Sequence, residues 1–263
     1  MREKEAVVEV EHLDAGYGGE AALEDVNLRV ARGEILAILG GSGCGKSTLL
    51  RHIIGLNPPL AGRVKLCGEV LAEAGTEIPD SMRSRLLARM GVMFQSGALF
   101  GSMTLTENVR LPLDEFTDLP KGLKKAITQL KLEQVGLGDF GDNYPAEISG
   151  GMRKRAAIAR AMSLDPDALF LDEPSAGLDP VTSAEIDELI LSLRDAFGTT
   201  VVLVTHELPS IFAVADRAVY LDREARGVLD EGTPQELREA SKHERVRNFF
   251  ARGKLSGKTA VGE

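Results

Sequence analysis

Short apolar runs along the chain predict buried strands. The clearest cover residues 34–39, 168–171 and 199–204, and each run is rich in Ile, Leu, Val or Phe. Helical patterns lie between them, for example over residues 48–55 and after Pro180, where Ile186, Leu189, Ile190 and Leu193 recur at helical spacing. Because strands alternate with helices, this part of the chain predicts an α/β fold with a parallel sheet wrapped by helices.

The N-terminal part has a different pattern. Residues 7–13, 22–30 and 63–67 read as strands, and no helical pattern separates the first two. Residues 14–19 between those two read as a turn. We therefore expect an antiparallel β-subdomain at the N-terminal edge of the parallel core sheet.

A long mixed segment over residues 105–151 predicts helices inserted into this α/β pattern. We expect a helical subdomain of about residues 105–162, within a larger domain of residues 1–240. One helix in it is expected to supply part of an apolar face through four residues, Leu123, Ile127, Leu130 and Leu132.

The end of the chain reads as a separate tail over residues 241–263, which we expect to be partly mobile after Arg252. Before it, residues 233–236 form a capping box with proline at the first helical position. Val246, Phe249 and Phe250 allow two interpretations. They pack on their own domain, or they dock on a neighbouring copy of the chain.

One glycine-rich loop joins a predicted strand to a predicted helix. It has the pattern G-x-x-x-x-G-K-S and consists of Gly40, Gly41, Ser42, Gly43, Cys44, Gly45, Lys46, Ser47 and Thr48. Glycines let backbone N–H groups converge on an anion, and the helix N-terminus adds partial positive charge. Lys46 is placed to reach the β- and γ-phosphates, and the Ser47 hydroxyl to ligate Mg²⁺. The loop therefore predicts binding of a nucleoside triphosphate.

Composition indicates the class of protein and the compartment in which this site occurs. Hydrophobic residues make up 43% and charged residues 27% of the 263 residues, as in an ordinary globular protein. The net charge of -9 argues against nucleic-acid binding. Cys44 and Cys67 are the only cysteines, which favours a reducing compartment. We expect a cytoplasmic protein without a signal peptide or membrane span, so any role in a membrane must come through a partner.

Further candidate residues follow other predicted strands. Asp172 and Glu173 end an apolar strand, where Asp172 is placed to hold Mg²⁺ and Glu173 to polarise an attacking water as general base. Gln95 ends another strand and is placed to sense Mg²⁺ and water. His206 follows residues 199–205 and is placed to contact the γ-phosphate. Taken alone, each has a structural interpretation, such as an acid pair that closes a strand.

Ser149, Gly150 and Gly151 begin a helix and form a second anion cradle. An ordinary serine-capped helix would look the same. One nucleotide cannot easily use two such cradles of one chain, so a second chain would complete each site.

Six features follow one another along the chain: the phosphate loop, Gln95, residues 148–152, residues 169–173, residues 175–179 and His206. In their order and spacing they resemble an ATP-binding-cassette (ABC) ATPase over about residues 7–237. The resemblance implies a P-loop NTPase fold of the ABC ATPase type, a head-to-tail homodimer, and ATP and Mg²⁺ as cofactors. It implies that Tyr17 stacks on adenine, that the helix cradle is the family signature, that Asp179 links the two sites, and that Lys46, Glu173 and His206 act in catalysis. The metal site would comprise Ser47, Gln95 and Asp172.

Three positions depart from the common ABC pattern. Ile148 and Met152 stand where leucine and glutamine are usual, and Gly41 where proline is frequent. These departures point to a subgroup. Residues 94–100 (FQSGALF), with residues 149–152 (SGGM) and 245–250 (RVRNFF), resemble the ATPase of Mce-type lipid transporters. That subgroup implies a peripheral location on the cytoplasmic face of the inner membrane, two permease subunits, a periplasmic Mce lipid-binding ring and a STAS-domain protein as partners.

Other classes remain as alternatives. An importer ATPase for small solutes, such as amino acids, shares all the ATPase motifs. A non-transport ABC ATPase usually has a coiled-coil insert or two cassettes, and neither is seen here. A GTPase would need an Asn-Lys-x-Asp motif, which does not occur. The motifs do not give the direction of transport.

Overall fold

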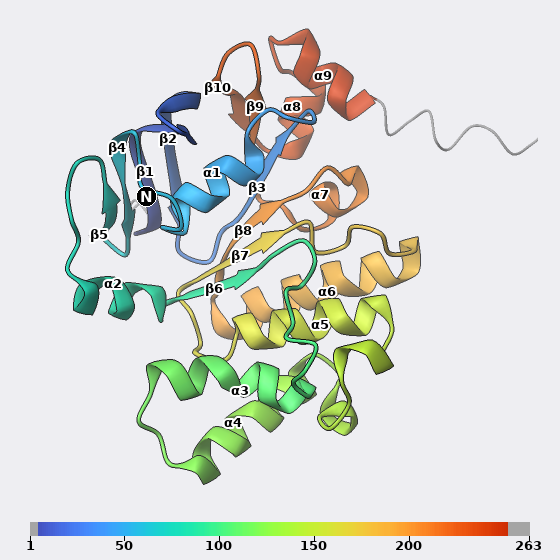
Figure 1. The fold of residues 1–263 in the computed structure, drawn as a ribbon. Helices are drawn as coiled ribbons and strands as arrows, with labels where there is room; N and C mark the ends of the chain where they lie inside the picture. The colour runs from blue at the N-terminus through green and yellow to red at the C-terminus, as the bar shows by residue number, and fades with distance from the viewer. Residues whose placement is uncertain (1–4, 252–263) are drawn as a thin grey trace, which may run out of the picture.

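The strands form two sheets in the computed structural model, which describes residues 5–251 (Figure 1). The N-terminal sheet has the order β2-β1-β4-β5 and its pairs are antiparallel, as expected. Its strands are β1 (Ala6–Tyr17), β2 (Glu20–Ala31), β4 (Ala61–Leu66) and β5 (Glu69–Glu73). The turn prediction for residues 14–19 was too wide, because β1 continues to Tyr17, and β5 was not predicted.

The larger sheet has the order β10-β9-β3-β8-β7-β6. Five strands run parallel, and β10 pairs antiparallel with β9 at the edge. They are β3 (Ile35–Gly40), β6 (Met90–Met93), β7 (Ala168–Asp172), β8 (Thr200–Val204), β9 (Arg217–Asp222) and β10 (Gly227–Gly232). The strands β3 and β8 are buried along their whole length, which explains their continuous apolar sequences.

Side chains of alternate residues of β3 enter cores on opposite faces of the sheet. Leu36 and Ile38 pack with α1 (Lys46–Ile53) and with the N-terminal sheet. Ile35 packs with α5 (Gly150–Ala161) and α6 (Pro180–Phe197) on the other face. Figure 1 shows α1 above the sheet and α5 and α6 below it. The helices that follow the two anion cradles therefore cover opposite faces.

The helical subdomain lies beyond α5 in Figure 1. It contains α3 (Leu105–Phe116), α4 (Lys121–Gln134) and two 3₁₀ turns, Gly138–Phe140 and Pro145–Glu147, while α2 (Asp80–Leu87) precedes β6. Residues of α3, α4 and α5 share one core that includes Leu105, Leu132 and Ala156.

The predicted apolar face of α4 was partly wrong. Leu132 is buried, but Leu123 is 47% and Leu130 50% exposed. Lys124 and Lys131 are buried instead, because their stems pack inward while their ammonium groups find partners. The Lys131 Nζ lies 2.5 Å from an Asp165 oxygen, and the Lys124 Nζ donates to the Thr117 carbonyl at 3.0 Å.

The C-terminal helices are α7 (Leu208–Val214), α8 (Pro234–Glu239) and α9 (Glu244–Ala251). The predicted capping box of α8 is confirmed. Phe250 meets Phe212 edge-on with ring centroids 5.6 Å apart, and Val246 is buried in the same cluster. The apolar residues of α9 thus pack on their own domain, one of the two interpretations above. Residues 252–263 of the expected tail lie outside the described residues.

Candidate functional site

The glycine-rich loop leaves β3 at Gly40 and enters α1 at Lys46. Gly40 has φ 147°, and a Cβ there would lie 2.4 Å from the Leu221 carbonyl oxygen. Gly45 has φ 101°, and its Cβ would press on Leu23. These two positions require glycine for both conformation and space. By contrast, a Cβ at Gly41 or Gly43 would meet nothing within 4 Å, so the loop's outer side is open.

The N-terminus of α1 is prepared for an anion. No side chain caps it, and its first turn holds no acidic residue. The Lys46 Nζ donates to the loop's own carbonyls, at 2.9 Å to Gly40 and 3.2 Å to Gly41. These neutral acceptors are weaker partners than a phosphate, so the ammonium can exchange them for a γ-phosphate. Burial raises the pKa of the Cys44 thiol, so Cys44 contributes to the loop through its backbone rather than through a thiolate.

Glu173 is the most constrained residue next to this loop. It has φ 51°, a left-handed conformation that costs about 1–3 kcal/mol for such a residue. Its N–H donates to the Val204 carbonyl at 2.8 Å, and its Oε1 lies 2.7 Å from the His206 Nδ1. The buried Oε2 has no hydrogen-bond partner in the part of the chain that the structure describes. An unpartnered carboxylate oxygen beside a phosphate loop is suited to accept a proton from water.

Asp172 ends β7 directly before Glu173. Burial, together with the charge of Glu173, raises the pKa of the Asp172 carboxyl. A cation bound there would oppose both effects. Asp172, Ser47 and Gln95 offer carboxylate, hydroxyl and amide oxygens, which are the hard donors that Mg²⁺ prefers. Within residues 5–251 no group of three or more His, Cys, Asp or Glu forms a metal cluster, so oxygens of a bound phosphate would complete such a site.

The parallel strands explain why these residues meet. The carboxyl ends of β3, β6, β7 and β8 lie at one edge of the sheet, and the loop, Gln95, Asp172–Glu173 and His206 follow those ends. Tyr17, at the end of β1, is 51% exposed and accepts a hydrogen bond from Arg51 of α1 at 3.3 Å. It therefore stands beside the helix that begins in the loop.

Two predicted site residues also serve as helix caps. Ser149 accepts a hydrogen bond from the Met152 N–H at 3.2 Å, so it caps α5. Asp179 caps α6, accepting from the N–H groups of Val181 and Thr182 and from the Thr182 hydroxyl. The two cradles begin helices that cover opposite faces of the sheet, α5 on one and α1 on the other.

The sequence reasoning missed Lys154. It lies in the helix that Ser149, Gly150 and Gly151 were predicted to begin, and no role was predicted for it. In the structure its side chain is buried and donates to the carbonyls of Gln95 at 2.6 Å and Glu173 at 2.9 Å. Arg153, Arg155 and Arg160 lie on the same helix, so no local pattern distinguished Lys154 from its basic neighbours.

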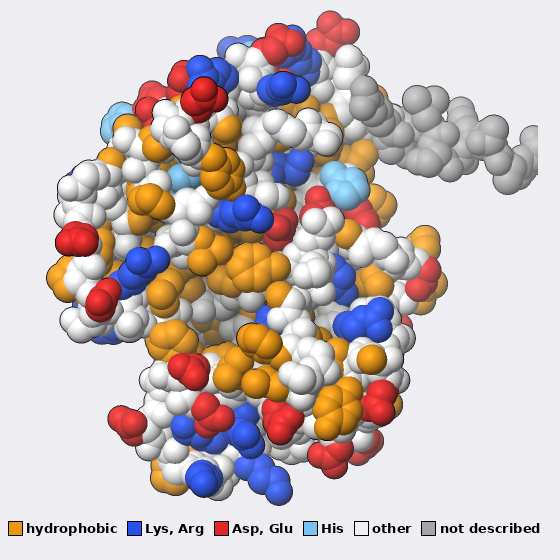
Figure 2. All heavy atoms as spheres, in the orientation of Figure 1, with side chains coloured by type: hydrophobic (Ala, Val, Ile, Leu, Met, Phe, Trp, Pro, Cys, Tyr) orange, Lys and Arg blue, Asp and Glu red, His pale blue; other side chains and the backbone are white. Residues whose placement is uncertain are grey.

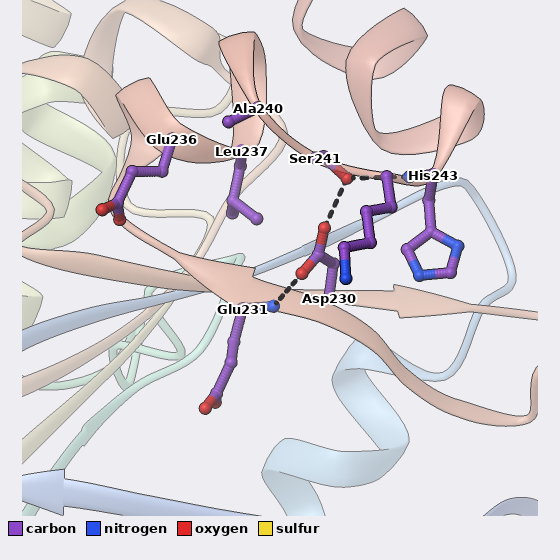
Figure 3. Close-up of a pocket in the computed structure, with 8 residues that line it drawn as sticks. Asp230, Glu231, Glu236, Leu237, Ala240, Ser241 and His243 are labelled. Atoms are coloured by element: carbon purple, nitrogen blue, oxygen red, sulfur yellow. Dashed lines mark hydrogen bonds between the residues drawn. The ribbon is translucent and has the colours of Figure 1, made fainter.

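A separate pocket lies between β10 and the connection from α8 to α9 (Figure 3). Its lining includes Asp230, Glu231 and Glu236, and Asp230 accepts a hydrogen bond from Ser241. Three carboxylates would repel a triphosphate, so this pocket does not compete with the glycine-rich loop as a nucleotide site.

Comparisons with known proteins agree with this geometry. A family profile described as "ABC transporter" matches residues 23–176. The chain is 40% identical over 248 residues to the intermembrane phospholipid transport system ATP-binding protein MlaF of Escherichia coli K12, covering 93% of this chain and 88% of MlaF. It is 37% identical over 256 residues to the probable ribonucleotide transport ATP-binding protein mkl of Mycobacterium leprae, covering 97% and 72%. The dimeric, post-hydrolysis structure of the ATP-binding cassette MJ0796 with ADP and phosphate is similar with a TM-score of 0.76 and 30% identity, covering 86% and 98%.

Proposed function

Because the chain belongs to the ABC transporter family and is an ATPase, we propose that it energises phospholipid transport between two membranes. The observation that carries this proposal is the 40% identity to MlaF across 93% of the chain. The position of the residues typical of the family at one edge of the sheet supports the ATPase activity separately. There the loop would bind phosphate, and His206 holds the Glu173 carboxylate in place.

In the proposed mechanism, the backbone of residues 40–48 and Lys46 hold the phosphates of ATP, and Tyr17 stacks on the adenine. Glu173 takes the proton of the attacking water through Oε2, the oxygen without a protein partner. His206 holds Oε1 and so fixes the orientation of the carboxylate. Catalysis of this kind depends on positioning and charge neutralisation.

Mg²⁺ fits the oxygen donors of Ser47, Gln95 and Asp172. When bound, it would neutralise charge on the β- and γ-phosphates. The raised pKa of Asp172 reflects burial and the neighbouring Glu173 charge, and a cation is the expected counterpart for this acid pair.

We propose that two copies of the chain form a head-to-tail dimer. Ser149, Gly150 and Gly151 of one chain would close over the ATP held by the loop of the other. The position of α5 opposite α1 supports this arrangement, because neither chain can use both cradles on one nucleotide. The related cassette MJ0796 is dimeric with ADP and phosphate bound.

The membrane component would be a permease bound near the segment after β6. Among the described residues, no helix is long and apolar enough to cross a membrane. Phe100 in that segment is 50% exposed, and Phe116 at the end of α3 is also exposed. Figure 2 shows hydrophobic side chains gathered between the helical part and the sheets on one face of the molecule. Exposed apolar side chains of this kind suit a permease contact.

The proposed location is therefore the cytoplasmic face of the inner membrane, held there by the permease. By analogy with Mce-type systems, a periplasmic Mce lipid-binding protein and a STAS-domain protein are proposed as further partners.

Purification of the complete complex would test the substrate. We expect mass spectrometry of the bound ligand to identify phospholipid, and ATP hydrolysis by the complex in vesicles to increase with phospholipid supply. The second candidate is a small polar solute, favoured by the name of the mycobacterial relative. Recovery of a nucleotide or amino acid alone, without lipid, would reject the lipid proposal while leaving the ATPase intact.

A further inference from the structure

Lys154 connects three parts of the molecule that the proposed mechanism treats separately. It lies on α5, five residues after the Ser149 cap. Its Nζ donates to the Gln95 carbonyl at 2.6 Å and the Glu173 carbonyl at 2.9 Å, and the residue is only 8% exposed. Both carbonyls belong to residues that follow adjacent parallel strands, β6 and β7. One ammonium group therefore joins the signature helix, the Gln95 segment and the catalytic carboxylate's own backbone.

The contact with Glu173 matters because that peptide is strained. A left-handed glutamate needs support from its surroundings. Its N–H is bound by Val204 at 2.8 Å and its carbonyl by Lys154, so the residue is held on both sides. Loss of the lysine would free the carbonyl side. The backbone could then relax and turn the carboxylate away from the position set by His206.

The Gln95 segment is bound to α5 at a second point. Gly97 and Ala98 both have positive φ, and Arg160 of α5 donates to their carbonyls at 2.9 and 2.7 Å. A displacement of α5 would therefore move this segment with it. Lys154 extends the same connection to Glu173.

We propose that Lys154 is a positioning residue that transmits the position of the signature helix α5 to Gln95 and Glu173 of the same chain. In the dimer proposed above, on which this inference rests, α5 responds to the nucleotide of the other chain. Engagement of Ser149 there would thus align the water-polarising carboxylate here. The assignment gives the lysine a role in hydrolysis without contact to the reacting atoms.

The test compares Lys154→Met with Lys131→Met in the assembled complex. Lys131 is a matched control, because it is also a buried lysine with an ion-pair partner, but it pairs with Asp165, away from the strand ends that carry the site. We expect Lys154→Met to lower kcat about 30- to 100-fold with KM for ATP within about threefold of wild type, because misplacement near the chemistry costs about 100-fold. Lys131→Met should lower thermal stability but retain kcat. Lys154→Arg, which keeps two donors, should recover most of the rate.

Further comparisons separate this inference from the proposed function. If Lys154→Met has the kcat of Lys131→Met, or if kcat and ATP affinity fall together, the positioning role is wrong. If Lys154→Met does not fold, Lys154→Gln takes its place with the same expected split. Glu173→Gln is measured alongside. A fully active Glu173→Gln would contradict the proposed catalytic base, whereas an inactive one with an unaffected Lys154→Met would contradict only the positioning role.

Discussion

Replacement of Glu173 by glutamine tests the proposed chemistry most directly. The amide keeps the shape and the acceptor that can meet the His206 Nδ1, now 2.7 Å from Oε1. The other carboxylate oxygen, Oε2, has no hydrogen-bond partner among the described residues. An amide nitrogen in its place therefore does not add a further buried atom without a partner. One net hydrogen bond contributes about 1 kcal/mol, and the free energy of unfolding should therefore change by no more than about 1 kcal/mol.

The effect on hydrolysis should be far larger. A general base contributes about 10²- to 10⁴-fold, which corresponds to about 2.7–5.5 kcal/mol of activation free energy. Phosphate release by the assembled complex should fall by that factor while equilibrium ATP binding is retained. In the proposed mechanism the closed dimer opens only after hydrolysis. A variant that binds ATP without hydrolysing it should therefore accumulate as a dimer in size-exclusion chromatography with ATP.

A matched control is available in Asp187, a second buried carboxyl, which lies on α6. Asp187→Asn should retain the rate of hydrolysis. Wild-type phosphate release by the Glu173→Gln complex would refute the assignment of Glu173 as the base. Loss of ATP binding together with a lowered melting temperature would instead show that the carboxylate stabilises the fold.

Three further substitutions have distinct readouts. Ser149→Arg should abolish phosphate release by the dimer but leave ATP affinity of the monomer unchanged, measured by equilibrium binding, because the α5 cradle serves the other chain. Burial lowers the pKa of His52, whose Nε2 accepts a hydrogen bond from the Gly16 N–H at 3.1 Å. The contribution of His52 to the free energy of unfolding should therefore be fully present above the ordinary pKa of 6.5 and decrease as the pH falls below it. Urea unfolding at about pH 7.5 and about pH 5.5 should show this decrease in the wild type and not in His52→Gln. Phe250→Ala should lower the free energy of unfolding by about 3–5 kcal/mol, because it empties the contact with Phe212.

Each of these has a control on the same chain. Ser192→Arg places the same charge on an exposed position of α6 and should retain activity. His12→Gln makes the same substitution at an exposed histidine and keeps His52 in place. Phe116→Ala removes a half-exposed ring and should cost much less than Phe250→Ala. Weaker ATP binding by the Ser149→Arg monomer would contradict the role of the α5 cradle in the other chain. An unchanged pH dependence of stability in His52→Gln would contradict the role of His52. Equal decreases in the free energy of unfolding for the two phenylalanine variants would contradict the role of the Phe250 contact.

Local sequence determined the strands and the loop because their requirements are local. Residues 35–39 and 201–204 are apolar throughout, a composition typical of strands that are buried on both faces. Gly40 and Gly45 have positive φ, and glycine at those positions was readable from the motif. The order of motifs resembled ABC ATPases, and the family match confirmed that the chain belongs to this family.

Tertiary structure alone decided which buried positions are polar. The apolar-face prediction for α4 was partly wrong because Lys124 and Lys131 are buried with partners outside the helix, Thr117 and Asp165. Periodicity counts lysine as exposed, but a long stem with a paired ammonium group can be buried. The packing of Phe250 against Phe212 was likewise open, because a tail residue's contacts depend on the path of the chain.

The same reason explains Lys154. Its partners are two backbone carbonyls 59 and 19 residues away, and backbone atoms leave no trace in the sequence. What the sequence determined is the set of groups proposed to bind phosphate and polarise water, since these need particular side chains at particular strand ends. What the fold decided is how those strand ends are held together, because that depends on distances between segments that no local pattern encodes.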